Sequence, residues 1–78
     1  MENLMDRITR DKEICNGKPV IRGLRITVST ILELLLFGTP EAEILKQYPD
    51  LDKADIEASR LFTLKMFRKN FSFRNSLN

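Results

Sequence analysis

The residues that could carry chemistry in this sequence are few, and histidine is not among them. The chain has 78 residues with no histidine and a single cysteine, Cys15. Histidine is the commonest general base and metal ligand in proteins, and one cysteine cannot supply the usual zinc sites. Without a histidine to activate it, Cys15 is better interpreted as a small buried hydrophobe or an inert loop thiol. The sequence therefore predicts no catalytic residues, no metal site and no cofactor, and we expect no enzyme.

A group of carboxylates is the remaining candidate for metal chemistry. Asp50, Asp52 and Asp55 lie close together in the sequence, and a small nuclease can hold a divalent cation with three or four carboxylates. The same spacing is typical of a helix cap and of acids in the first helical turn, and we favour this interpretation. Gly17-Lys18 lacks the other residues of a phosphate-binding loop. We therefore predict no nucleotide site and no small-molecule substrate.

Cations that could bind a polyanion lie near both ends of the sequence. Residues 1–26 carry six Lys or Arg against four Asp or Glu, residues 27–57 carry two against seven, and residues 58–78 carry five against none. We expect any polyanion to be met by the basic ends, although solvated surface charge gives the same pattern. The predicted nucleic-acid contacts in the basic head are Lys18, Arg22 and Arg25.

The cations of the head lie in a segment that predicts a β-hairpin from Gly17 to Val28. Two runs rich in β-branched residues flank an Arg-Gly-Leu-Arg turn. If Gly23 and the residue after it are central, glycine in the first position favours a type II′ turn. Arg22 and Arg25 then lie opposite each other. A further short strand is predicted around Ile8.

The first of three predicted helices follows this hairpin. Thr27, Ser29 or Thr30 can cap it, and Thr30 with Glu33 has the spacing of a capping box. The segment from residue 31 to residue 37 is apolar except for Glu33, so we expect this helix to be the buried central one. Gly38 is a suitable left-handed stop.

The other two helices also have start signals in the sequence. Thr39-Pro40-Glu41 supplies an N-cap, a proline in the first helical position and an early acid, and Pro49 ends that helix. Asp52 is predicted to cap the third helix, with Asp55 in its third position. The second and third predicted helices together have the length of a helix-turn-helix, but ordinary packing of helices produces the same pattern. The acidic start of the third helix disfavours its binding to DNA phosphates.

The third helix contains more apolar residues than one small core can bury. Apolar residues between Leu61 and Phe67 fall on most sides of a helix, and this surplus indicates a second contact surface. We predict a domain at residues 1–67 and a basic, Phe-containing tail at residues 68–78. The predicted partner-binding residues are Phe62, Met66, Phe67, Arg68, Lys69, Phe71, Phe73 and Arg74.

Length and composition limit the class of protein. Hydrophobic residues make up 42% of the chain and charged residues 31%, which is typical of a globular domain. A chain this short buries only roughly 60–65% of its unfolded surface, so we expect a homodimer or a complex to add stability. No apolar run approaches the ~20 residues that span a bilayer, and no secretory leader is recognisable. We expect a soluble cytoplasmic protein.

Several short blocks, taken in order, are similar to a known family. Gly17-Lys18-Pro19, Arg22-Gly23-Leu24-Arg25 and Tyr48-Pro49-Asp50-Leu51 resemble the bacterial family called domain of unknown function 433, over roughly residues 6–63. The resemblance implies a helix-turn-helix-like fold and an antitoxin role, because members are often encoded beside small nuclease-like toxins. The chain departs from the family pattern at Arg60, where an apolar residue is usual, and in its Phe-rich basic tail.

We therefore expect a mainly α chain with a short N-terminal β-hairpin and a three-helix, helix-turn-helix-like core. The expected function is that of an antitoxin-type binding module, which neutralises a small nuclease-like toxin by docking its C-terminal end on it. Antitoxins commonly repress their own operons, so DNA binding is compatible with this role. Two alternatives remain open: a stand-alone dimeric DNA-binding regulator, and a structural homo-oligomer without a nucleic-acid partner.

Overall fold

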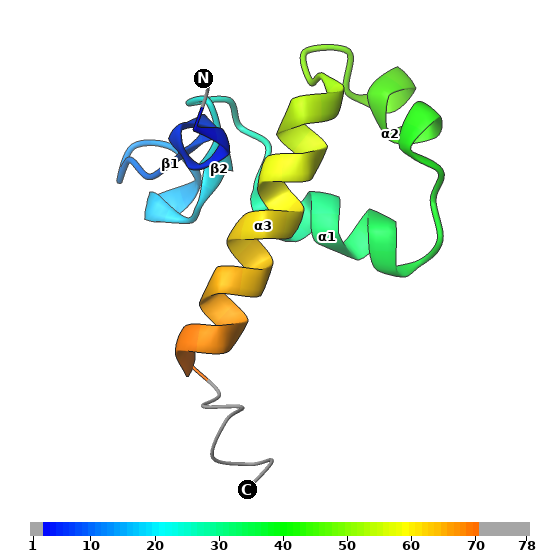
Figure 1. Cartoon of the computed structure of the whole chain (residues 1–78). Coiled ribbons are helices and arrows are strands. Elements are labelled where there is room, and N and C mark those ends of the chain that lie inside the picture. The colour runs from blue at the N-terminus through cyan, green and yellow to red at the C-terminus, as the bar shows by residue number, and fades with distance from the viewer. Residues whose placement is uncertain (1–2, 71–78) are drawn as a thin grey trace, which may run out of the picture.

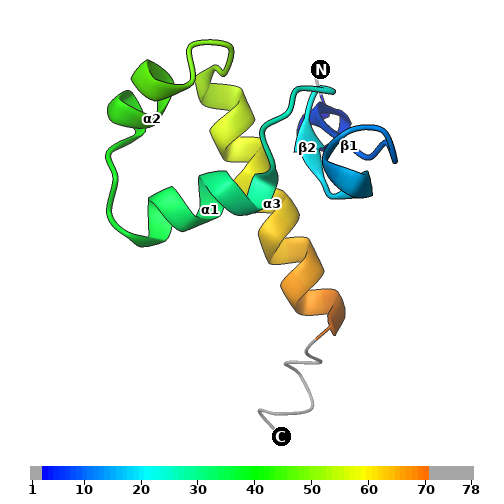
Figure 2. The same ribbon diagram turned by 180° about the vertical axis from the view of Figure 1, so that it is seen from behind.

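The longest helix of the chain, α3 (Lys53–Asn70), contacts elements on both of its sides. The computed structural model describes residues 3–70. In it, α1 (Val28–Leu36) and α2 (Glu41–Gln47) lie on one side of α3, and a two-stranded sheet lies on the other (Figure 1). The view from behind gives the same arrangement (Figure 2). The chain is mainly α-helical with a short N-terminal β-hairpin, which confirms the predicted fold class.

The sheet pairs two strands that are well separated in the sequence. Strand β1 (Ile8–Thr9) runs antiparallel to β2 (Val20–Ile21), and a 3-10 turn, η2 (Cys15–Gly17), lies between them. The predicted partner strand after the Arg-Gly-Leu-Arg turn contributes a single bridge, between Val20 and Thr27. It cannot extend further as a strand because α1 begins at Val28. The hairpin predicted from Gly17 to Val28 is present in short form: besides this bridge, the Ile21 N–H donates to the Ile26 carbonyl oxygen at 3.1 Å and the Val28 N–H donates to the Pro19 carbonyl oxygen at 3.0 Å. The strand predicted around Ile8 is confirmed as the second partner of β2.

The turn that follows β2 differs in type from the prediction. The Leu24 N–H donates to the Ile21 carbonyl oxygen at 2.7 Å, so Arg22 and Gly23 are the central residues. Their φ angles are 46° and 74°, and positive φ at both central positions is the signature of a type I′ turn rather than type II′. A non-glycine residue such as Arg22 rarely adopts this conformation. Its side chain must therefore be held by contacts elsewhere.

Helix α1 begins where one of its three candidate caps indicated. Thr27 is the N-cap, and its hydroxyl oxygen accepts a hydrogen bond from the Thr30 N–H at 3.1 Å. The capping box predicted for Thr30 and Glu33 is wrong, because Thr30 already lies inside the helix. Gly38 has a φ of 84° directly after the helix, which confirms the predicted left-handed stop.

Helix α2 begins one residue later than the sequence predicts. Pro40 occupies the N-cap position in an extended conformation, and no side chain caps the helix there. The predicted N-cap role of Thr39 is therefore wrong. The helix ends at Gln47, ahead of Pro49, whose ring disfavours helical conformation in the residue before it.

The core lies where α1, α2, α3 and the sheet meet. Its buried residues come from every one of these elements and are Ile21, Val28, Ile31, Ile44, Leu51 and Ile56. Helix α1 is buried on one side only, because Leu36 is 76% exposed and Phe37 is 83% exposed. The prediction that α1 is the buried central helix is wrong. The central helix is α3. Helix α2, with seven residues, is too short to cover the rest of α1.

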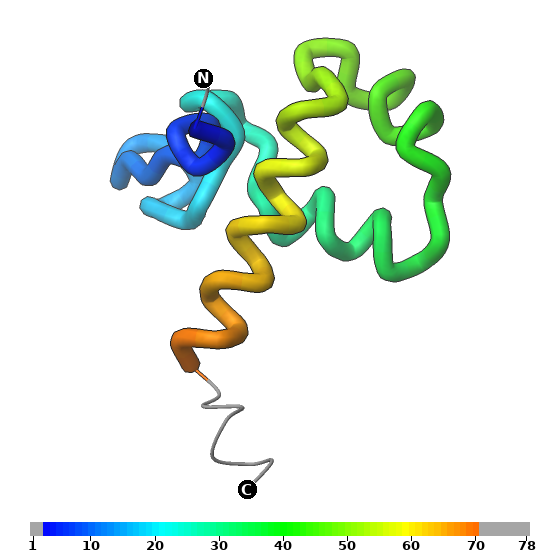
Figure 3. The backbone as a smooth tube through the Cα atoms, in the orientation of Figure 1, coloured from blue at the N-terminus to red at the C-terminus, as the bar shows by residue number. Residues whose placement is uncertain are grey.

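Two further features complete the description. A second 3-10 turn, η1 (Leu4–Arg7), precedes β1 and packs against α3. The C-terminal part of α3 extends beyond the other elements, as the chain trace makes clear (Figure 3). Within residues 3–70, no helix combines the length and apolar character that crossing a membrane requires.

Two residues of α3 provide a matched test of the core. Ile56 is fully buried and Leu64 is 44% exposed. We expect Ile56→Ala to lower the free energy of unfolding by about 2–5 kcal/mol, because it leaves a cavity. Leu64→Ala, on the same helix, should change it by less than about 1 kcal/mol. Urea denaturation followed by circular dichroism measures both, and equal losses would show that the core is assigned incorrectly.

Candidate interaction surfaces

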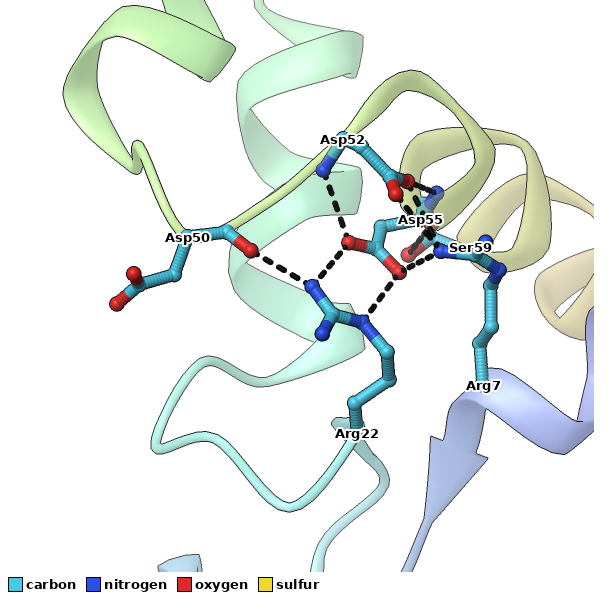
Figure 4. Close-up of polar contacts among 6 residues, drawn as sticks. All are labelled: Arg7, Arg22, Asp50, Asp52, Asp55 and Ser59. Carbon is cyan, nitrogen blue, oxygen red and sulfur yellow. Dashed lines mark hydrogen bonds and ion pairs between the residues drawn. The ribbon is translucent and has the colours of Figure 1, made fainter.

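The carboxylate of Asp55, in the first turn of α3, accepts hydrogen bonds from three residues. Its side chain is fully buried and accepts hydrogen bonds from two arginines (Figure 4). Arg22 donates through Nε at 3.0 Å and Nη2 at 2.9 Å, and Arg7 donates through Nη1 at 2.8 Å. The Asp52 N–H donates a further bond at 2.9 Å. Both carboxylate oxygens are therefore satisfied, as a buried charge requires.

Asp52 and Asp55 hold each other in place at the start of α3. The Asp55 N–H donates to Oδ1 of Asp52 at 3.0 Å, which makes the arrangement reciprocal, like a capping box. Arg7 also donates to Oδ1 of Asp52, at 2.9 Å. The predicted capping role of Asp52, with Asp55 in the third position, is confirmed.

The left-handed turn after β2 directs Arg22 toward this cap. Besides its two bonds to Asp55, Arg22 donates through Nη2 to the backbone carbonyl oxygen of Asp50 at 2.6 Å. The side chain of Asp50 points away from the other two aspartates (Figure 4). Within residues 3–70, no group of three or more Cys, Asp or Glu side chains is placed to hold a metal ion. The aspartates thus join the turn to α3.

The charges around Asp55 set its pKa. Burial raises the pKa of this carboxyl, but hydrogen bonds from Arg22, from the Asp52 N–H and from Arg7 lower it more, and the pKa falls from 3.8 to about 2. The hydrogen bond to Asp55 in turn raises the pKa of Arg22. Both groups are therefore charged at neutral pH.

The three predicted nucleic-acid contacts differ in their surroundings. The guanidinium of Arg22 is engaged with Asp55 and Asp50, so a phosphate would have to compete with a buried carboxylate for it. Arg25 and Lys18 are exposed. Arg22 and Arg25 do not face each other as predicted, because Arg22 is itself a central residue of the turn. Binding of nucleic acid by Lys18 and Arg25 stays a prediction.

An apolar groove of about 370 Å³ lies between the start of α1 and the C-terminal half of α3. Three of the predicted partner-binding residues, Phe62, Met66 and Phe67, line it together. Pro19 and Leu32 line it from the other side, beside Val28. The structure therefore brings these three predicted residues onto one surface, and the spacing of four residues explains this for Phe62 and Met66. Their role in partner binding stays a prediction.

The other predicted partner-binding residues lie elsewhere. Arg68 and Lys69 are exposed in the last turn of α3 and do not line the groove. Phe71, Phe73 and Arg74 lie outside the described residues.

Sequence reasoning missed two arginines that the structure places at these surfaces. Arg7 binds Asp52 and Asp55, and the guanidinium carbon of Arg10 lies 5.9 Å from the centroid of the Phe62 ring. A cation at this distance from an aromatic ring is attracted to its face. Neither contact leaves a local signal, because the partners are more than 40 residues apart in the sequence.

A protein-family model described as protein of unknown function (DUF433) matches residues 8–62, which is more than half of the chain. The chain belongs to this family. The DUF433 match spans the hairpin, α1, α2 and the first half of α3. It includes Arg22, Asp52 and Asp55 and stops where the exposed end of α3 begins. No curated protein and no solved structure matches the chain significantly.

The buried carboxylate of Asp55 makes the free energy of unfolding depend on pH. Because the pKa of Asp55 is lowered from 3.8 to about 2, its stabilising contribution is present above pH 4 to 5 and is lost as the pH falls through about 2. We expect the free energy of unfolding to fall by about 2 kcal/mol across this range. Urea denaturation at a series of pH values measures the slope.

Two substitutions assign that slope to its group. Asp55→Asn should flatten it and should also destabilise the chain at neutral pH by about 3–5 kcal/mol, because two arginines lose their buried counter-charge. Asp50→Asn is the matched control, since the Asp50 side chain makes none of these contacts. A slope that persists in the Asp55→Asn chain would contradict this assignment.

Proposed function

We propose that this DUF433 chain is an antitoxin-type protein-binding module that docks the exposed end of α3 on a small nuclease-like toxin. The observation that carries the proposal is the surface of the last turns of α3, called here the α3 end (residues 64–70). Leu64 is 44% exposed and Phe67 is 42% exposed, and the α3 end extends beyond the rest of the fold (Figure 1). Large apolar side chains on a protruding helix favour a partner protein.

The charge of the α3 end favours an acidic partner. Lys65, Arg68 and Lys69 are all exposed, and no acidic residue follows Glu57 in the sequence. Metal-dependent nucleases hold their cations with carboxylates. An arginine can bind such a carboxylate through two parallel hydrogen bonds and so compete with the metal. Inhibition by occupation of the acidic site follows from this chemistry.

The arrangement of the hairpin favours protein binding over operator binding as the primary role. Arg22, the central cation of the predicted DNA-binding hairpin, is engaged with Asp55. The first turn of α3 carries Asp55, and Asp52 caps it, so a phosphate at this end of the helix would have to displace these carboxylates from their arginines. An apolar and basic helix end has neither obstacle toward an acidic protein.

Charge reversal on the α3 end tests the proposal. We expect Lys65→Glu/Arg68→Glu to weaken binding to the nuclease-like partner, to be sought among the products of the neighbouring genes, at least about tenfold, because attraction becomes repulsion. Isothermal titration calorimetry and an assay of nuclease inhibition provide the measurements. The matched control is Lys46→Glu/Lys53→Glu, which reverses two exposed lysines away from the α3 end. Equal affinity of both double variants and the wild-type chain would refute the proposal.

A further inference from the structure

Helix α1 leaves the C-terminal end of one of its faces exposed in the described part of the chain. Ser29, Leu32 and Leu36 follow one another at spacings of three and four residues, which places them on one face. Ile31, which is fully buried, lies on the opposite face. Leu36 is 76% exposed, and Phe37, directly after the helix, is 83% exposed. The apolar side chains of Leu36 and Phe37, at the C-terminal end of α1, are therefore exposed to solvent.

The same face of α1 leads into the groove at the other end of the helix. Ser29 and Leu32 line the groove together with Phe62 and Met66 of α3. Figure 2 shows the start of α1 beside α3 and the far end of α1 away from it. One surface thus carries an apolar hollow at the N-terminal end of α1 and an apolar projection at its C-terminal end.

We infer that the groove receives a second copy of this chain. In the inferred dimer, two α1 helices pack antiparallel about a two-fold axis, and Leu36 and Phe37 of each copy enter the groove of the other. An antiparallel pair places the C-terminal end of one helix beside the N-terminal end of its twin. Because the groove and the projecting residues lie at opposite ends of α1, the projection of each copy meets the groove of the other, and the interface contains this contact twice. Such an interface uses the same surface on both copies and closes with two members.

The charges at the two ends of α1 are complementary. Among the described residues that line the groove, Lys18 alone is charged, and no ion pair within residues 3–70 includes it. Glu33 and Glu43, which flank the projecting end of α1 in the sequence, are exposed and likewise have no ion pair in this part of the chain. The last turn of α1 contains no basic residue, and the C-terminal end of a helix carries partial negative charge. An acidic projection thus fits a groove edged by a lysine.

The inferred dimer is independent of the proposed function. Leu64, Lys65 and Arg68 do not line the groove, so they stay accessible when a second copy fills it. Met66 and Phe67 belong both to the groove and to the α3 end. The charge reversals at Lys65 and Arg68 and the substitutions at Phe37 and Met66 nevertheless change different contacts, so self-association and partner binding can be tested separately.

A pair of complementary variants tests the dimer. Sedimentation equilibrium of the full chain over a range of concentrations gives its dissociation constant. We expect Phe37→Glu and Met66→Lys each to weaken the dimer at least about tenfold, because each puts one charge into an apolar contact. Mixing the two variants should restore a dimer to within about threefold of the wild-type dissociation constant. In the mixed pair, one contact is the native one, and in the other the introduced glutamate meets the introduced lysine.

The control is Leu64→Glu, an exposed α3 position outside the groove, which should leave the dissociation constant unchanged. Restored association on mixing also shows that both variants are folded. A wild-type chain that stays monomeric up to about 1 mM would overturn the inference and leave the groove to another protein. So would single variants that dimerise as well as the wild-type chain, or a mixture that does not associate.

Discussion

The buried carboxylate of Asp55 is the constraint on which the arrangement of this small fold depends. An ionised carboxylate without partners costs several kcal/mol to remove from water, so a buried one requires cations and hydrogen bonds around it. Arg7 and Arg22 supply them from η1 and from the turn after β2, two segments far from α3 in the sequence. The left-handed backbone of Arg22 is therefore explained: the turn adopts it because the side chain has a fixed destination. Stability and the orientation of the sheet against α3 come from the same contact.

Features encoded within a few residues were predictable from the sequence. The reciprocal pair of Asp52 and Asp55 has a three-residue spacing that predicts a cap, and Gly38 supplies the positive φ that ends α1. The network around the cap was not predictable. Asp55 is 33 residues from Arg22 and 48 residues from Arg7. Local secondary-structure propensity does not indicate which distant arginine will contact a given carboxylate.

The error about α1 and the unpredicted pairing of β2 with β1 share a physical cause. Apolar composition predicts that a helix seeks burial, but burial also requires neighbours long enough to cover it, and α2 has only seven residues. Likewise, a β-branched run predicts a strand but does not name its partner. β2 pairs with β1, and its pairing with the expected segment is limited to one bridge because that segment becomes the cap of α1 at Thr27. Of the candidate partner site, the sequence predicted the residues Phe62, Met66 and Phe67, while the groove that unites them also needs α1.

The continuity of α3 has a consequence for how this fold can diversify. Its first half is tied into the core through Asp55, Ile56 and Ala58, all of them fully buried, whereas the residues from Leu64 onward contribute little to that core. One uninterrupted helix holds both halves in a fixed relation. The end of α3 can therefore change its sequence, and with it the surface it offers, without altering how the chain folds. If the α3 end binds a partner as proposed, exchanging this stretch between family members would change the partner and leave the scaffold intact.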